Sequence, residues 1–149
     1  MTIRWLLATI HLLALGMGLG AVAARARGLR APVSEDRLPG VFIADALWGV
    51  AALLWISTGL WRAFGGLEKG SAYYLSSTAF LIKMTLLGLI LILEAWPMLT
   101  LIRWRAARAK GDQLSLEAAP ALARISAVQA VLVVAMVFAA TAMARGIGS

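Results

Sequence analysis

One apolar stretch constrains the fold more than any other part of the sequence: residues 79–103, AFLIKMTLLGLILILEAWPMLTLIR. A membrane span needs about 20 apolar residues, so this stretch can cross a bilayer, yet it contains Lys83 and Glu94. On a helix with about 100° and about 1.5 Å per residue, eleven positions place these side chains within about 20° of one face and about 16 Å apart. Because an ionisable side chain at membrane depth costs about 3 kcal/mol, both should face a bundle interior.

The composition and three more apolar runs extend this conclusion to the whole chain. The 149 residues are 62% hydrophobic and 14% charged, which is not typical of a soluble domain. The predicted spans are about residues 5–24, 41–61, 79–102 and 125–144. Short connections make successive helices antiparallel neighbours. We therefore predict an all-α integral membrane protein, a four-helix up-down-up-down bundle in which residues 1–149 form a single transmembrane domain.

The first span has two competing interpretations. An apolar run with a small-residue end resembles a signal peptide, but Arg25, Arg27 and Arg30 follow it directly. Basic residues at this point favour a retained helix whose end faces the cytoplasm. Within the span, Gly16 and Gly20 repeat at a spacing of four residues, which allows close helix packing. That packing is either intramolecular or the seam of a homodimer through Gly16 and Gly20.

The basic residues are divided unevenly between the two sides of the predicted bundle. The first and third connections with their flanks hold nine: Arg25, Arg27, Arg30, Arg37, Arg103, Arg105, Arg108, Lys110 and Arg124. The opposite side holds four: Arg4, Arg62, Lys69 and Arg145. This bias predicts a protein of the bacterial inner membrane with both termini periplasmic. The basic residues bracket apolar runs, so the predicted partner is the lipid bilayer and not nucleic acid.

The orientation sorts the polar residues of the spans into two layers. His11 and Lys83 fall in the outer half, whereas Asp45, Glu94 and Gln129 form a polar seam in the inner half. Basic residues at the inner boundary could pair with the two carboxylates by snorkelling; they are Arg25, Arg103 and Arg124. The seam is therefore either structural charge pairing or part of an ion pathway, and His11 is either a hydrogen-bonded neutral imidazole or a ligand.

Two further features bear on packing. Trp48, Trp55 and Trp61 fall on roughly one stripe, which is typical of a packing surface or an interfacial belt. Pro97 lies late in the third span and lacks the N–H that would bond the carbonyl of Leu93, which predicts a kink beside Glu94.

Several segments carry a resemblance to known proteins: MTIRWLLATIHLLALGMGLG, ALWGVAALLWISTGLWRAFGGLEKGSAYYL, AFLIKM and EAWPMLTLIRW. Across essentially its whole length the chain resembles an uncharacterised bacterial family of small membrane proteins, catalogued as domain of unknown function 2214. More distantly, it is similar to the four-helix group that includes the copper-resistance D proteins and the membrane-type protoporphyrinogen oxidase, a haem b protein. The oxidase pattern has a His in its first helix and a Lys followed eleven residues later by a His in its third. Here the matching positions are His11, Lys83 and Glu94, so the second imidazole is missing.

Three functional hypotheses follow. The resemblance implies haem b as the cofactor, with His11 as the ligand of the haem iron and Lys83 beside a propionate or as a sixth ligand. Apart from that haem iron no metal is expected, because the chain has one histidine and no cysteine. The alternatives are a non-catalytic membrane subunit or assembly factor, and a small proton- or cation-coupled transporter acting as a dimer through Asp45 and Glu94. Whether the protein is an enzyme stays open, since no nucleophile, base and orienting group occur together.

Overall fold

Four long α-helices make up the structure, a computed structural model that describes residues 2–30, 32–66 and 77–147. They are α1 (Thr2–Gly28), α2 (Leu38–Phe64), α4 (Thr78–Lys110) and α5 (Ala119–Ala144), and a short 3-10 helix, η1 (Glu35–Arg37), precedes α2. Each long helix contains one predicted span and extends beyond it. All four are long and apolar enough to cross a membrane, which confirms the predicted all-α membrane bundle.

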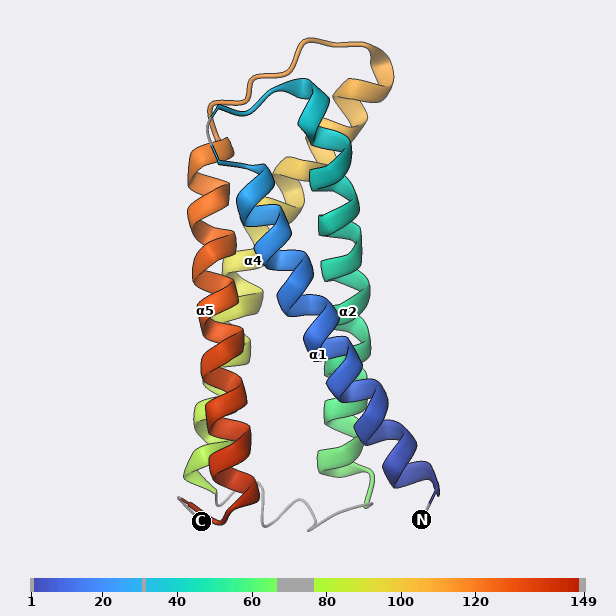
Figure 1. The fold of residues 1–149 in the computed structure, drawn as a ribbon, viewed down its shortest axis with the longest axis vertical. Helices are drawn as coiled ribbons and strands as arrows, with labels where there is room; N and C mark the ends of the chain where they lie inside the picture. The colour runs from blue at the N-terminus through green and yellow to red at the C-terminus, as the bar shows by residue number, and fades with distance from the viewer. Residues whose placement is uncertain (1, 31, 67–76, 148–149) are drawn as a thin grey trace.

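Successive helices run in opposite directions, and both chain termini lie at one end of the bundle (Figure 1). We call this the terminal end and the opposite end, where α1 leads to α2 and α4 leads to α5, the connection end. Helix α1 packs along α2, α4 packs along α5, and α1 also packs on α5, whereas α2 and α4 touch very little. The up-down-up-down bundle therefore consists of two helical hairpins that are joined mainly through α1 and α5.

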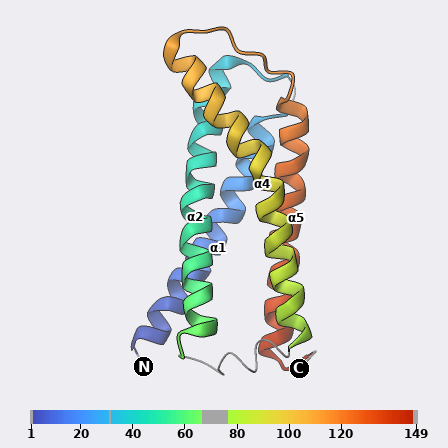
Figure 2. The ribbon, with the colours of Figure 1, turned by 180° about the vertical axis from the view of Figure 1, so that it is seen from behind.

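Local sequence signals set several helix ends. The Ser77 hydroxyl accepts a hydrogen bond from the backbone N–H of Phe80 at the start of α4, as an N-cap residue does. Gly111 ends the same helix with φ of 77°, a left-handed conformation that glycine adopts without strain. Helices α2 and α5 each have a proline in the first turn, where a missing N–H costs nothing. Between its ends α4 contains Pro97, and the helix bends along its length (Figure 2).

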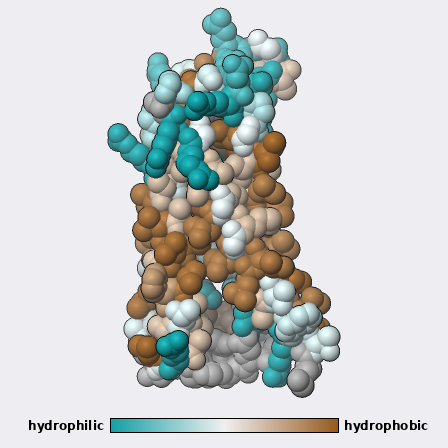
Figure 3. All heavy atoms as spheres, in the orientation of Figure 1, coloured by the Kyte–Doolittle hydropathy of each residue, from teal (hydrophilic) through white to brown (hydrophobic). Residues whose placement is uncertain are grey.

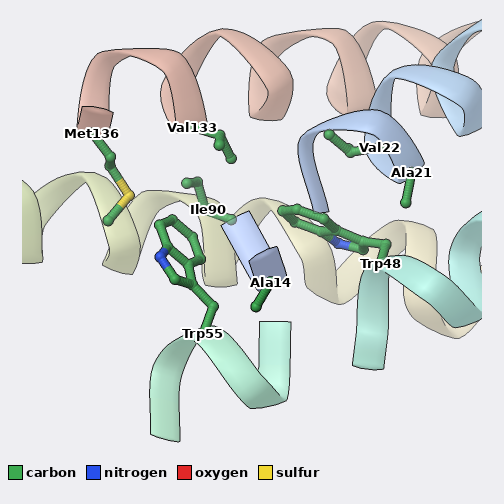
Figure 4. Packing of buried hydrophobic residues seen from close by; sticks show 8 residues of the cluster. All are labelled: Ala14, Ala21, Val22, Trp48, Trp55, Ile90, Val133 and Met136. Atoms are coloured by element: carbon green, nitrogen blue, oxygen red, sulfur yellow. The ribbon is translucent and has the colours of Figure 1, made fainter. Parts of the chain in front are cut away.

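The core is built around two tryptophans of α2 (Figure 4). Trp48 and Trp55 are buried, and both rings point between the other helices toward residues such as Ile90 and Met136. The third member of the predicted tryptophan stripe, Trp61, is exposed. Helix α1 comes close to α2 at Gly18, where an added Cβ atom would lie 3.3 Å from Ala51 Cβ. Two tryptophans of the stripe therefore pack in the core, and the third faces outward.

The outer surface of the bundle is apolar around its middle. Figure 3 shows a hydrophobic band across the bundle, with hydrophilic side chains gathered at the connection end. Many large apolar side chains are exposed, among them Leu53, Ile92 and Phe138, as expected for helices that face lipid. Gly16 and Gly20 also lie on the exposed surface, and no described atom is within 4 Å of a Cβ built on either. Packing within the chain therefore uses Gly18, and the homodimer seam through Gly16 and Gly20 stays a prediction.

Candidate functional site

Arg25 lies at the centre of a polar cluster inside the connection half of the bundle. It occupies the last turns of α1, and its side chain has no exposed surface. A guanidinium group has five N–H donors, and Arg25 makes five hydrogen bonds to side chains of the other three long helices. The acceptors are Asp45 Oδ1 at 2.7 Å, Glu94 Oε1 and Oε2 at 2.8 Å each, Gln129 Oε1 at 2.8 Å and Ser126 Oγ at 3.0 Å. One side chain of α1 thus connects all four helices.

The two carboxylates of the cluster are held by further donors. Glu94 Oε2 also accepts hydrogen bonds from Trp48 Nε1 at 2.9 Å and from Gln129 Nε2 at 2.8 Å. Asp45 Oδ2 accepts one from Arg105 Nη2 at 2.8 Å, and the Arg105 guanidinium lies 5.1 Å from the centre of the Phe42 ring. The side chains of Asp45 and Glu94 are only 10% and 18% exposed. We call this set the arginine cluster; its members are Arg25, Asp45, Trp48, Glu94, Arg105, Ser126 and Gln129.

The arginine cluster is balanced in charge and in hydrogen bonds. Two guanidinium groups face two carboxylates, so its formal charge is zero. Ser126 Oγ donates its own proton to the carbonyl of Leu122 and can therefore accept from Arg25. In the described part of the chain no buried side-chain nitrogen or oxygen lacks a hydrogen-bond partner. A buried ion pair of this kind is costly to break from one side, because the remaining charge would be left without its counter-charge.

The structure brings the three residues of the predicted seam together, but with partners that differ in part from the expected ones. Asp45, Glu94 and Gln129 all contact Arg25. Arg103 and Arg124 are exposed and form no ion pair with any described residue, whereas Arg105 binds Asp45. The sequence contained a signal for Arg105, since it follows Glu94 by the same eleven residues that separate Lys83 from Glu94. Because α4 continues to Lys110, this spacing keeps all three side chains near one helix face.

His11 occupies the other half of the bundle and is held by α2. Its Nδ1 lies 2.9 Å from Thr58 Oγ1, and Thr58 Oγ1 lies 2.6 Å from the carbonyl oxygen of Leu54. Thr58 Oγ1 also lies 3.2 Å from the carbonyl oxygen of Trp55, so its single hydroxyl proton has two backbone acceptors, and we therefore assign the proton of the bond between the two side chains to Nδ1 of His11. The imidazole is then the tautomer whose Nε2 carries the lone pair. Trp55 packs beside the ring at 6.1 Å between centroids, and a Cβ built on Gly59 would lie 3.1 Å from His11 Cε1.

His11 and Lys83 both line a cavity of about 380 Å³ near the terminal end, which we call the terminal pocket. All four long helices contribute to its wall, which is mostly apolar; its members include Trp55, Phe80, Met84, Leu87, Met136 and Ala140. On the face shown in Figure 3 the surface is hollowed near the terminal end, between the two hairpins. The volume falls within the range of about 300–1,000 Å³ that is usual for small-molecule sites. No group of three or more metal-binding side chains occurs among residues 2–30, 32–66 and 77–147.

The comparisons with known proteins give a family and no activity. The family model described as "Predicted membrane protein (DUF2214)" matches residues 3–148. The chain belongs to this family. No curated protein matches the chain, and no solved structure does. The expected membership is thus confirmed, whereas the more distant similarity to the copper-resistance D proteins and the protoporphyrinogen oxidase gains no support. Nothing from the family assigns a role to either the arginine cluster or the terminal pocket.

Proposed function

We propose that the protein binds a haem or related porphyrin in the terminal pocket. The observation that carries the proposal is that His11 and Lys83 both line one mostly apolar cavity of small-molecule size. In the arginine cluster every donor of Arg25 is used by the protein itself. The terminal pocket combines an apolar wall with the imidazole of His11 and two cationic side chains, Arg62 and Lys83, around about 380 Å³ of space. A ligand therefore fits the terminal pocket better than the arginine cluster.

The residues of the terminal pocket fit a porphyrin in three respects. Nε2 of His11 carries the lone pair that an axial ligand needs, and the bond from Nδ1 to Thr58 fixes the ring, as partners of metal-binding histidines commonly do. Lys83 supplies a positive charge suited to a propionate. Trp55, Phe80 and Leu87 supply apolar surface for the macrocycle. When bound, haem would supply one-electron chemistry; this chain would bind, orient and screen it from water.

Two alternatives place the function elsewhere. A non-catalytic membrane subunit or assembly factor is favoured by the complete pairing inside the arginine cluster, which needs no ligand. A proton- or cation-coupled transporter would use Asp45 and Glu94, but both carboxylates bind Arg25, so transport requires these ion pairs to open. Transport by a four-helix chain would also need a dimer, and the exposed face of Gly16 and Gly20 is our candidate for it.

Absorption spectroscopy tests the haem proposal. The protein is expressed with added haem precursor and purified in mild detergent, and we expect a Soret band that His11→Phe abolishes while the variant stays folded. Ser57→Ala serves as the matched control, because Ser57 is an exposed hydroxyl beside Thr58 and does not line the pocket. This control should keep the band. A wild-type protein without a Soret band, or a band unchanged in His11→Phe, would rule out this site.

A further inference from the structure

A second hollow lies at the connection end, at the opposite end of the bundle from the terminal pocket. It has a volume of about 270 Å³ and lies beside the end of α1 and the first turns of α5. Its lining residues are Arg30, Pro120, Ala123, Arg124 and Ala127. We propose that this hollow binds the headgroup of an anionic phospholipid, with one acyl chain lying on α5. We call it the lipid hollow, and the argument for it is independent of haem binding.

The first support is charge. Arg30 and Arg124 are both exposed, and neither side chain forms a hydrogen bond or ion pair with another described residue. Every ion pair found within the described ranges belongs to the arginine cluster, which uses Asp45 and Glu94 completely. The lining of the lipid hollow contains no carboxylate. The two guanidinium groups therefore face one space without a carboxylate partner from the protein, and their N–H donors can bind a phosphate group.

The second support is the shape and polarity of the floor. Ala123 and Ala127 are four residues apart on α5, so they lie on the same helix face and one turn from each other. Ala127 is partly exposed and its small side chain leaves room against the helix, whereas Ala123 is buried in the core and Ser126 and Gln129 turn toward Arg25. An acyl chain can lie on Ala127 while the phosphate stays with the arginines. A soluble anion would gain nothing from this apolar floor.

The third support is position relative to the apolar band. In the view where α1 and α5 lie toward the reader, hydrophilic side chains cover the connection end directly beside the hydrophobic band (Figures 1 and 3). Phospholipid phosphates occupy such a boundary, and basic pockets between transmembrane helices bind anionic headgroups there. A zwitterionic headgroup fits less well, because its own cation would meet the surrounding arginines. We therefore assign the hollow to an anionic phospholipid such as phosphatidylglycerol.

Native mass spectrometry of the delipidated full chain in detergent tests the proposal by titration with phosphatidylglycerol or phosphatidylcholine. We expect one tightly bound phosphatidylglycerol, preferred at least roughly tenfold over phosphatidylcholine. Arg30→Gln/Arg124→Gln should abolish the preference. Arg27→Gln/Arg37→Gln removes the same charge from exposed positions outside the hollow and should keep it. Equal loss in both double variants would mean diffuse charge attraction and would overturn the site.

A second variant and a soluble probe separate the lipid from a free phosphate. Ala127→Phe keeps both arginines but fills the apolar floor, so we expect it to weaken phosphatidylglycerol binding as well. Glycerophosphoglycerol has the same phosphodiester headgroup without acyl chains and should bind far more weakly than the lipid. If it binds as tightly, or if Ala127→Phe binds lipid like the wild type, the hollow is not a phospholipid site. Thermal melts show that the variants compared are folded.

Discussion

At the scale of single residues, Arg25 is the most constrained side chain of the protein. A buried arginine is tolerated only where its charge and its donors are compensated. Here the compensation comes from two carboxylates and from the oxygens of Ser126 and Gln129. Removal of one carboxylate therefore affects more than one bond, because the guanidinium remains inside the bundle whatever happens to its partner.

We expect Glu94→Gln to destabilise the protein by about 3–5 kcal/mol, because it leaves Arg25 with only Asp45 as counter-charge. In addition, Glu94 Oε2 accepts three hydrogen bonds, and an amide has an NH₂ donor in place of one of the two carboxylate oxygens. His11→Phe should cost only about 1 kcal/mol, since it removes the bond to Thr58 but keeps an aromatic ring beside Trp55. Unfolding in detergent, followed by circular dichroism, measures both losses.

The double variant Arg25→Met/Glu94→Gln is the control for this prediction. It removes both charges together and leaves the pair between Arg105 and Asp45 in place, so it should be more stable than Glu94→Gln alone. Equal losses of stability for Glu94→Gln and His11→Phe, or a larger loss for His11→Phe, would contradict the assignment of the structural role to the arginine cluster and of the binding role to His11.

The sequence made part of this cluster predictable. Charged residues inside apolar runs must face the interior and meet, which is why Asp45, Glu94 and Gln129 could be assigned to one layer. Trp48 and Ser126 could not be assigned to it, because a tryptophan or serine in an apolar helix looks the same whether it binds a carboxylate or merely packs. Arg105 lies beyond the predicted span, and only the true length of α4 brings it back to Asp45.

At the scale of helices, two nearby glycines of α1 differ in what they contact. A side chain at position 18 would press on Ala51 and on the ring of Trp48, whereas one at position 16 meets no described atom within 4 Å. We expect Gly18→Val to destabilise the monomer by about 1–3 kcal/mol, because it forces α1 away from α2. Gly16→Val is the matched control and should leave monomer stability nearly unchanged. If the two variants have the same melting temperature, the close packing of α1 on α2 at Gly18 is contradicted.

Helix boundaries were the least predictable feature at this scale. The predicted spans end where hydropathy falls, but the helices continue through basic residues, as α4 does to Lys110. An arginine or lysine does not break a helix, since its side chain can extend toward water while the backbone stays helical. The apolar runs therefore mark the part of each helix that can lie in the membrane, and the ends of the helices beyond these runs come from the structure.

At the scale of the whole molecule, the orientation in the membrane remains a prediction. The connection end carries most of the basic residues, which favours its location in the cytoplasm. We expect a reporter fused after residue 149 to be active only in the periplasm, and a reporter inserted at Gly111 only in the cytoplasm. Paired enzymatic and fluorescent reporters measure this in intact cells. Cytoplasmic signal from the C-terminal fusion would reverse the assignment and place the terminal pocket on the inner side.

The terminal pocket itself could not be predicted, although His11 and Lys83 could be placed at the same height. Its space depends on how far the two hairpins stand apart, which follows from the slight contact between α2 and α4. Hydropathy shows that helices face one another but does not give the distance between them.

The charges of the arginine cluster are also divided evenly along the chain. The first hairpin contributes Arg25 and Asp45, and the second contributes Glu94 and Arg105. Within the cluster, each hairpin therefore supplies one cation and one anion, so neither half of the chain brings a net cluster charge into the bilayer. The ion pair of Arg25 with Asp45 is complete within the first half, and the bonds to Glu94 can form only when the second half arrives. We therefore expect the two hairpins to insert one after the other and then to associate through the bonds between Arg25 and Glu94 and between Arg105 and Asp45.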